Sequence, residues 1–209
     1  MTTRRLLPAL TLAVGLTACG EFQPQLGPNP PPAPPVPVAT TPDGDGSFHT
    51  VIDATSDSAY TGLDLEGGGV RADYGPSLTG WDLAFERYRI LTDSGIHGGG
   101  ACGTVAYTTG ASTFAALTAA PDPASTTYAV DATQPCNNPG GRCSLYVGSP
   151  FDVWWSEDAG AVTPGPYFFV LRSRSGQHYF KIQVVGYYDS VGDPAFVTIH
   201  WAPVAPPPG

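Results

Sequence analysis

The sequence is poor in the residue types and motifs on which catalytic and nucleic-acid sites depend. Lysine and arginine number 9 against 18 aspartates and glutamates, so the formal net charge at pH 7 is −9. Because the basic residues are few and form no cluster, we predict that the chain does not bind nucleic acid. It also contains no Gly-x-Ser-x-Gly elbow, no His-Glu-x-x-His motif and no phosphate-binding glycine loop followed by lysine. These absences predict that the chain is not an enzyme.

Long apolar runs are missing as well, and the most apolar stretch lies near the N-terminus. Residues 6–16 are too few to cross a bilayer, and Arg4 and Arg5 precede them. This pattern is typical of a signal peptide, which we assign to residues 1–18. The segment that ends it, Leu16-Thr17-Ala18-Cys19, resembles a bacterial lipobox, so we expect lipid attachment at Cys19. An ordinary secretory peptide cut after Ala18 is the alternative.

A lipid anchor would hold the protein at the outer membrane or cell surface, since Gly20 rather than an aspartate follows the cysteine. Acyl chains each contribute about 0.8 kcal/mol per buried methylene, so more than one chain makes the attachment stable. Residues 19–46 are rich in proline and predict an extended linker rather than a core. Loss of the two signal-peptide arginines changes the formal charge from −9 to −11, so membrane attachment would depend on the anchor alone.

Sulfur-containing residues are equally scarce. The single methionine, Met1, leaves with the signal peptide, and three cysteines remain in the folded part: Cys102, Cys136 and Cys143. In an exported protein, the turn-rich residues 137–142 favour a disulfide between Cys136 and Cys143, with Cys102 free. A bridge from Cys102 to either of the others is the alternative. No Cys-x-x-Cys pair and no nearby pair of histidines is present, which argues against a structural zinc site.

Residues 47–204 are left to form one domain, followed by a proline-rich tail at 205–209. The 26 glycines, the frequent aromatic residues and the lack of a 3.6-residue apolar period predict an all-β, antiparallel domain. One short helical segment is expected near residues 113–119. The strongest strand signal is a hairpin over residues 167–189 with Ser175-Gly176 as its turn. In that register Leu171 faces Phe180 on a wholly apolar face, as a hairpin covering a core requires. A longer loop with a bulge is the alternative.

Further strands are expected at residues 48–54, 62–66, 128–131, 151–155 and 196–201. Residues 80–92 predict one strand with a bulge near Glu86-Arg87, where the apolar alternation changes phase. Asp82 and Glu86 lie on one side of this strand. We interpret them as solvent-facing charges rather than as a catalytic pair of carboxylates.

The run Gly80-Trp81-Asp82-Leu83-Ala84-Phe85, followed by Arg87 and by a glycine-rich loop after Thr92, resembles the HmuY family of bacterial haem-binding lipoproteins. The resemblance continues through residues 114–121, 167–172, 176, 179–183 and 187–189 and through the closing strand at 197–201. It implies an all-β, HmuY-like fold that holds haem at one end of its sheets. It further implies capture of haem at the cell surface for uptake, with an outer-membrane haem receptor as a partner.

The resemblance implies two axial side chains, histidine or methionine, on the haem iron. No methionine is left, and residues 156–166, where a family ligand is expected, contain no histidine. We choose His97 and His178 as the ligands. His97 sits in a glycine-rich loop, where the backbone can approach a flat ligand closely, and His178 sits at the rim of the core beside the hairpin turn. His49 is placed in the first strand, and His200 is expected to point outward.

Several other residues are candidates for the same ligand. The iron could be bound by Tyr107, Tyr187, Tyr188 or the thiol of Cys102. The haem propionates could be bound by an arginine, because its guanidinium group binds carboxylates in a bidentate geometry. The candidates are Arg87, Arg89, Arg172 and Arg174. The alternative function is that of a HmuY-fold lipoprotein that has lost haem ligation and acts as a structural or protein-interaction module. The missing histidine before the hairpin favours that alternative.

Overall fold

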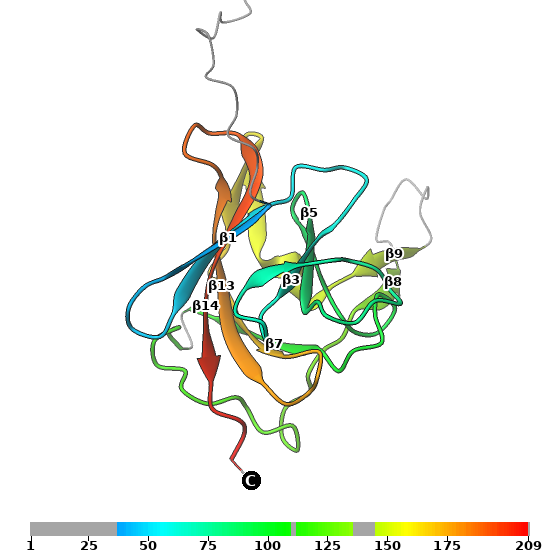
Figure 1. Cartoon of the computed structure of the whole chain (residues 1–209), viewed down its shortest axis with the longest axis vertical. Coiled ribbons are helices and arrows are strands. Elements are labelled where there is room, and N and C mark those ends of the chain that lie inside the picture. The colour runs from blue at the N-terminus through cyan, green and yellow to red at the C-terminus, as the bar shows by residue number, and fades with distance from the viewer. Residues whose placement is uncertain (1–36, 110–111, 136–144, 209) are drawn as a thin grey trace, which may run out of the picture. The chain divides into compact units, whose positions relative to one another are not determined.

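The structure, a computed structural model, describes residues 37–109, 112–135 and 145–208 (Figure 1). Within these residues all strands pair antiparallel, and the only helical element is one turn of 3-10 helix, η1 (Pro150–Val153). The prediction of an all-β antiparallel fold is therefore confirmed. In the described part, no helix has the length and apolar character needed to span a membrane.

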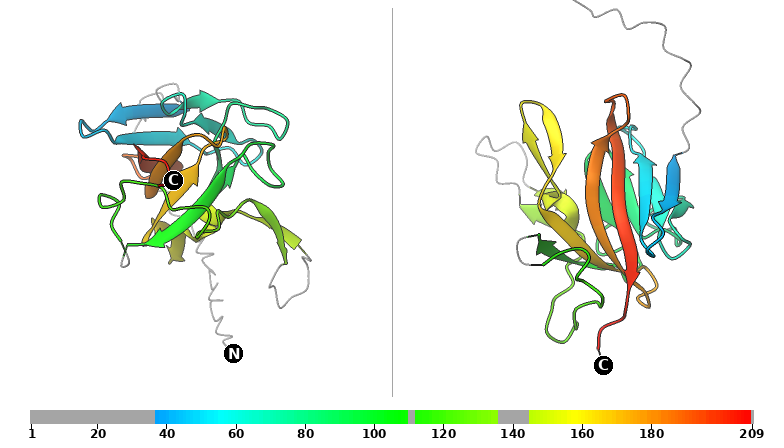
Figure 2. Two further views of the ribbon diagram at one scale, coloured as in Figure 1. Left: turned by 90° about the horizontal axis from the view of Figure 1, so that it is seen from below. Right: turned by 90° about the vertical axis from the view of Figure 1, so that its left-hand side faces the viewer.

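The main sheet has six strands in the order β1-β2-β14-β13-β12-β7. They are β1 (Val38–Pro42), β2 (Phe48–Asp53), β14 (Pro194–Val204), β13 (Tyr179–Tyr188), β12 (Tyr167–Arg172) and β7 (Gly103–Thr108). The right-hand view of Figure 2 shows the two long strands β13 and β14, in orange and red, running side by side through the domain. The sheet begins at Val38, so β1 extends it into the stretch that the sequence marks as linker.

A second sheet has four strands in the order β4-β3-β5-β6, and two ribbons of two strands each complete the fold. The second sheet contains β3 (Thr61–Asp64), β4 (Val70–Ala72), β5 (Leu83–Glu86) and β6 (Arg89–Thr92). The ribbons are β8 (Ala132–Pro135) with β9 (Leu145–Gly148), and β10 (Trp155–Asp158) with β11 (Ala161–Pro164). The largest cluster of buried side chains draws on both larger sheets, among them Ile52, Phe169 and Val197 from one and Leu63, Leu83 and Ile90 from the other.

The hairpin of β12 and β13 has the predicted register. Leu171 pairs with Phe180 and Phe169 with Ile182, and all four side chains are buried in the main core. The ladder ends at Arg172 and Tyr179, so residues 173–178 form a longer loop in which Ser173 N donates to His178 O. The opposite face of the hairpin is also covered, because Val170 and Tyr179 pack against Ala120.

Residues 80–92 do not form the single bulged strand that the sequence predicts. They form the tight hairpin of β5 and β6, with Glu86 paired to Arg89 and Arg87 at a φ of 53°. The change of phase in the apolar pattern is therefore a reversal of the chain. Asp82 lies just before β5 and is buried, so the interpretation of Asp82 as a solvent-facing charge is wrong.

Three smaller predictions are also wrong. Residues 113–119 contain a turn and no helix. Residues 151–155 fold largely as η1 rather than as a strand, because Ser149 caps the turn and Pro150 starts it. Residues 128–131 contribute one isolated bridge, between Ala129 and Thr104.

Of the four cysteines, Cys102 lies in the described residues. It is buried and has no disulfide partner among them. The proposed bridge between Cys136 and Cys143 and the lipid attachment at Cys19 lie outside the described residues.

Candidate functional site

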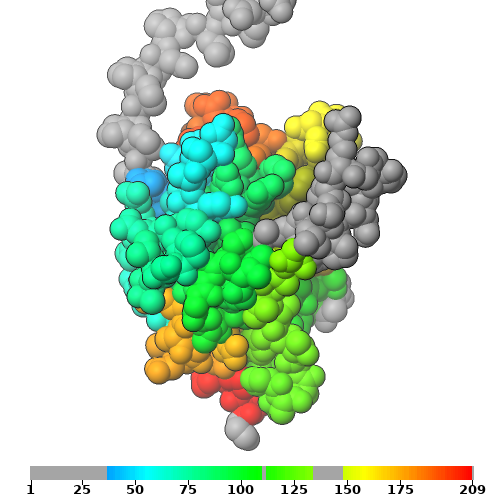
Figure 3. Space-filling view, turned by 90° about the vertical axis from the view of Figure 1, so that its right-hand side faces the viewer, coloured from blue at the N-terminus to red at the C-terminus, as the bar shows by residue number. Residues whose placement is uncertain are grey.

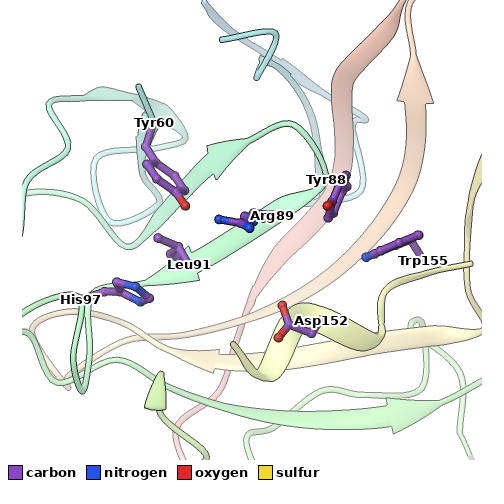
Figure 4. Close-up of a pocket in the computed structure, with 7 residues that line it drawn as sticks. All are labelled: Tyr60, Tyr88, Arg89, Leu91, His97, Asp152 and Trp155. Carbon is purple, nitrogen blue, oxygen red and sulfur yellow. The ribbon is translucent and has the colours of Figure 1, made fainter. Parts of the chain in front are cut away.

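A cavity of about 510 Å³ lies beside β6 and η1 (Figure 4). Its walls come from four parts of the chain: the segment before β3, the β5–β6 turn with β6, the glycine-rich loop after β6, and η1 with the start of β10. The side chains that line it are Tyr60, Tyr88, Arg89, Leu91, His97, Asp152 and Trp155. Three of these are large aromatic residues, so much of the wall is flat and apolar.

His97 is the one histidine among the lining residues, and a buried carboxylate orients its ring. Its Nδ1 lies 2.8 Å from Oδ2 of Asp131, whose side chain is fully buried, while the His97 side chain is 15% exposed. Asp131 is held in turn by Thr92, which donates from its backbone N (2.9 Å) and its hydroxyl (2.8 Å). In the neutral ring, Nδ1 therefore donates to Asp131 and Nε2 is left as the acceptor nitrogen.

The loop that carries His97 is held against the segment that leads into β8. Ile96 N donates to Asp131 O at 3.2 Å, and Asp131 N donates to the Ser94 hydroxyl at 3.2 Å. Figure 3 shows these parts, in green and yellow-green, next to each other on one face of the molecule. The histidine that lines the cavity is thus fixed by both its backbone and its ring.

The aromatic and charged side chains of the cavity interact with one another. The rings of Tyr88 and Trp155 lie 4.8 Å apart between centroids, tilted by 47°. Burial raises the pKa of Tyr60 to about 12, and the neighbouring Glu86 adds to that shift. A hydrogen bond with Tyr60 raises the pKa of Arg89, although partial burial opposes the shift. The cavity therefore has one permanent cation, Arg89, and one carboxyl group, Asp152, in a wall that also contains three large aromatic side chains.

His178, the second predicted ligand, lies outside this lining. Its side chain is 61% exposed, and Nδ1 is 3.3 Å from Oε1 of Glu66. Burial alone would raise the pKa of Glu66, but hydrogen bonds from Ser173, Ser175 and His178 and the charge of Arg174 outweigh it and lower that pKa to about 2. His178 is therefore largely exposed beside the hairpin turn and does not join His97 in the cavity.

Of the four arginines proposed for propionates, Arg89 lines the cavity. Arg174 forms ion pairs with Asp64, Glu66 and Asp82, and Arg172 donates from Nε to Ala101 O at 2.8 Å. Arg87 lies in the β5–β6 turn, with its backbone N bonded to Ala54 O. Arg89 is therefore the residue placed to meet a carboxylate of a ligand in this cavity.

None of the alternative iron ligands lines the cavity. The Tyr107 ring stacks on Phe168, the Tyr187 ring is buried in the main core, and the Tyr188 hydroxyl accepts from Val162 N. Burial raises the pKa of the Cys102 thiol, which keeps this residue from forming the thiolate that binds metals. The sequence reasoning missed Tyr60, Asp131 and Asp152, because only the folded chain brings them to His97.

Comparisons with known proteins agree with this architecture. A protein of Bacteroides vulgatus, provisionally described as HmuY-like and haem-binding, is 18% identical, with 78% of this chain and 95% of that chain covered and a TM-score of 0.54. A provisionally described lipoprotein of Bacteroides fragilis is 17% identical (78% and 93% covered, TM-score 0.54). The apo form of an HmuY analogue from Tannerella forsythia is 16% identical (78% and 95% covered, TM-score 0.54). At these identities, the likeness shows the fold alone.

No curated protein matches the sequence. Residues 70–201, more than half of the chain, match the family described as HmuY protein. They include β4 to β13, the cavity beside β6 except for Tyr60, and most of β14. The chain therefore belongs to the HmuY family.

Proposed function

We propose that this chain is a lipid-anchored haem-binding protein that captures haem at the cell surface for uptake. The observation that carries the proposal is the hydrogen bond of 2.8 Å between His97 Nδ1 and the buried Asp131, at the wall of an aromatic cavity. Metal-ligating histidines typically donate their second ring nitrogen to a carboxylate in this way, which fixes the ring and raises its basicity. The HmuY family consists of haem-binding proteins rather than enzymes, and this chain is not an enzyme.

The residues present fit haem in three respects. The cavity volume of about 510 Å³ lies within the usual range for small-molecule and cofactor sites, roughly 300–1,000 Å³. Tyr60, Tyr88 and Trp155 offer apolar faces to a flat macrocycle, and Arg89 offers a cation to a propionate. Haem would supply the iron. The chain would supply the imidazole of His97, oriented by Asp131.

His178 stays a prediction as the second axial ligand. Its loop is joined to the loop of His97, because Ala101 N donates to Arg174 O at 2.8 Å. The His178 ring contacts Glu66, so ligation would require that contact to break and the loop to move. Substituting the two histidines separately therefore tests the two ligands separately.

The anchor and the partner complete the proposal. Lipid attachment at Cys19 would hold the domain at the outer membrane, and the proline-rich linker would let the domain reach an outer-membrane haem receptor. A structural neighbour that is provisionally described as a lipoprotein supports the anchor. Labelling of cells with an azide-bearing fatty acid tests it, with Cys19→Ser as the variant that should lose the label.

Titration of the purified full chain with haemin tests the haem site. We expect a saturable Soret shift at one haem per chain, lost in His97→Ala and retained in the control His49→Ala. Asp131→Asn should weaken binding about 10- to 100-fold, because the ring loses its carboxylate partner. A shift of wild-type size in His97→Ala would refute the choice of ligand, and loss in His178→Ala would establish the second ligand.

The second candidate function is a HmuY-fold module that does not bind haem. Two observations favour it: the cavity lining contains a single histidine, and residues 156–166 contain none. In that case the titration with haemin gives no saturable change in the wild-type chain. That result would refute haem binding and leave the module as the function.

A further inference from the structure

A second group of metal-binding side chains lies on the six-stranded sheet, and it shares no residue with the cavity lining. His49 on β2 and His200 on β14 are direct cross-strand neighbours. Their rings stack with 4.6 Å between centroids and 6° between planes. Asp43, in the turn from β1 to β2, has Oδ1 2.8 Å from His49 Nδ1 and Oδ2 3.6 Å from His200 Nε2. One ligand atom of each residue lies within 4.8 Å of the other two.

We propose that Asp43, His49 and His200 bind a divalent transition-metal ion, with Zn²⁺ as the best-fitting class. Two imidazoles and one carboxylate are a donor set that Zn²⁺ accepts, with a water in the fourth position. Two ligands of one tetrahedral Zn²⁺ ion lie ~3.4 Å apart, given bond lengths of about 2.0–2.2 Å. The distances of 2.8 and 3.6 Å from Asp43 bracket this value. The two imidazole rings must turn out of their parallel stacking to direct their nitrogens at one ion.

The Ser47 hydroxyl keeps a partner when the metal binds. His200 Nε2 lies 2.9 Å from the Ser47 hydroxyl oxygen, and this hydroxyl donates to Asp45 Oδ1 at 2.6 Å. When Nε2 turns to a metal, Ser47 keeps Asp45 as its acceptor. The ion would then tie the β1–β2 turn to β14, which stiffens the start of the domain where the linker enters it.

Titration of the purified full chain with Zn²⁺ against a chromogenic chelator tests the proposal, and Co²⁺ serves as a spectroscopic probe of the ligand geometry. We expect one ion per chain and the intense visible bands of tetrahedral Co²⁺. His49→Ala and His200→Ala should each weaken binding by at least about 10-fold, and Asp43→Asn by a similar factor. Zn²⁺ should raise the thermal midpoint of the wild-type chain and leave that of the His49→Ala, His200→Ala double variant unchanged.

Matched controls separate this site from the other metal-binding groups of the chain. His97→Ala, His178→Ala and the double variant Cys136→Ser, Cys143→Ser should bind Zn²⁺ as the wild type does. Wild-type binding in the His49→Ala, His200→Ala variant, or loss of binding in the cysteine variant, would overturn the proposal. So would the absence of any saturable Zn²⁺ binding by the wild type. Haemin binding should be the same in the His49→Ala, His200→Ala double variant as in the wild type. The proposals of a metal site and of a haem site are therefore tested independently.

Discussion

Removal of the Arg174 guanidinium tests how the hairpin loop is held to the four-stranded sheet. Arg174 Nη1 lies 2.5 Å from Asp64 Oδ1 and 3.3 Å from Asp82 Oδ2, and Nη2 lies 3.3 Å from Glu66 Oε2. The Asp82 side chain is fully buried, whereas Asp64 and Glu66 are partly exposed. Arg174→Met keeps most of the side-chain length and removes the charge, so it leaves Asp82 as a buried anion without its cation.

The size of the effect follows from what Asp82 retains. Breaking a buried ion pair costs about 3–5 kcal/mol. Asp82 still accepts hydrogen bonds from Arg174 N and Leu65 N, both at 2.8 Å, and from Glu66 N at 3.3 Å. The loss of its ion pair should therefore cost an amount at the lower end of this range. The lost ion pairs with the partly exposed Asp64 and Glu66 add about 0.5 kcal/mol each. The expected loss in the free energy of unfolding is about 3–4 kcal/mol, which a domain with a stability of about 5–15 kcal/mol survives.

The stability lost in Arg174→Met should depend on pH, and the titration of Asp82 determines the direction of that dependence. Burial raises the pKa of Asp82, against the opposing effects of its backbone donors and of Arg174. A carboxyl group with a raised folded-state pKa contributes stability that is present below its ordinary pKa and is lost as the pH rises through the folded value. Without Arg174 that pKa rises further. The difference in stability between wild type and variant should therefore narrow from about pH 8 to about pH 5.

Urea unfolding of both proteins at the two pH values measures the difference. Arg71→Met is the matched control, because Arg71 is exposed on β4 and has no ion pair within the described part of the chain; it should change stability by no more than about 0.5 kcal/mol. A loss below about 1 kcal/mol for Arg174→Met at about pH 8 would show that Asp82 does not depend on the guanidinium. A loss of equal size at both pH values would show that the Asp82 carboxyl is not the group responsible.

Three further predictions concern the site loop, the thiol and the core. Gly95→Ala should weaken haemin binding and destabilise the fold, because a Cβ at this φ of +57° overlaps the Asp131 carbonyl; binding at wild-type strength would refute the role of the loop. Cys102 should resist thiol reagents until the chain unfolds, since burial raises its pKa. Rapid labelling of the native Cys19→Ser, Cys136→Ser, Cys143→Ser variant, whose one thiol is Cys102, would contradict the burial. Phe169→Ala should cost about 3–5 kcal/mol in urea unfolding, whereas Val191→Ala, 80% exposed, should cost little; similar costs would refute the core assignment.

Local patterns in the sequence predict the strands in which apolar and polar residues alternate regularly. The register of β12 with β13 follows from one apolar face, because a slip of one residue would turn Phe169 and Leu171 away from the core. The same reasoning failed at residues 80–92, where the reversal occupies only Arg87 and Tyr88 and neither is a glycine. A hairpin turn without glycine or asparagine appears in the sequence only as a change of phase in the apolar alternation. A β-bulge produces the same change of phase, so the pattern does not distinguish the two.

The sequence by itself determined the fold class and the strongest hairpin of this protein, since each depends on residues close together in the chain. The export signal stays a prediction. The sequence also singled out His97, through the glycines beside it. Only the tertiary structure decided what faces His97: Asp131 is 34 residues away, and Tyr60 and Trp155 come from elements on either side. The same holds for His49 and His200, which are 151 positions apart and become neighbours only when β2 pairs with β14. Strand pairing between distant segments is a property of the whole sheet, so these two sites could not be predicted from local patterns.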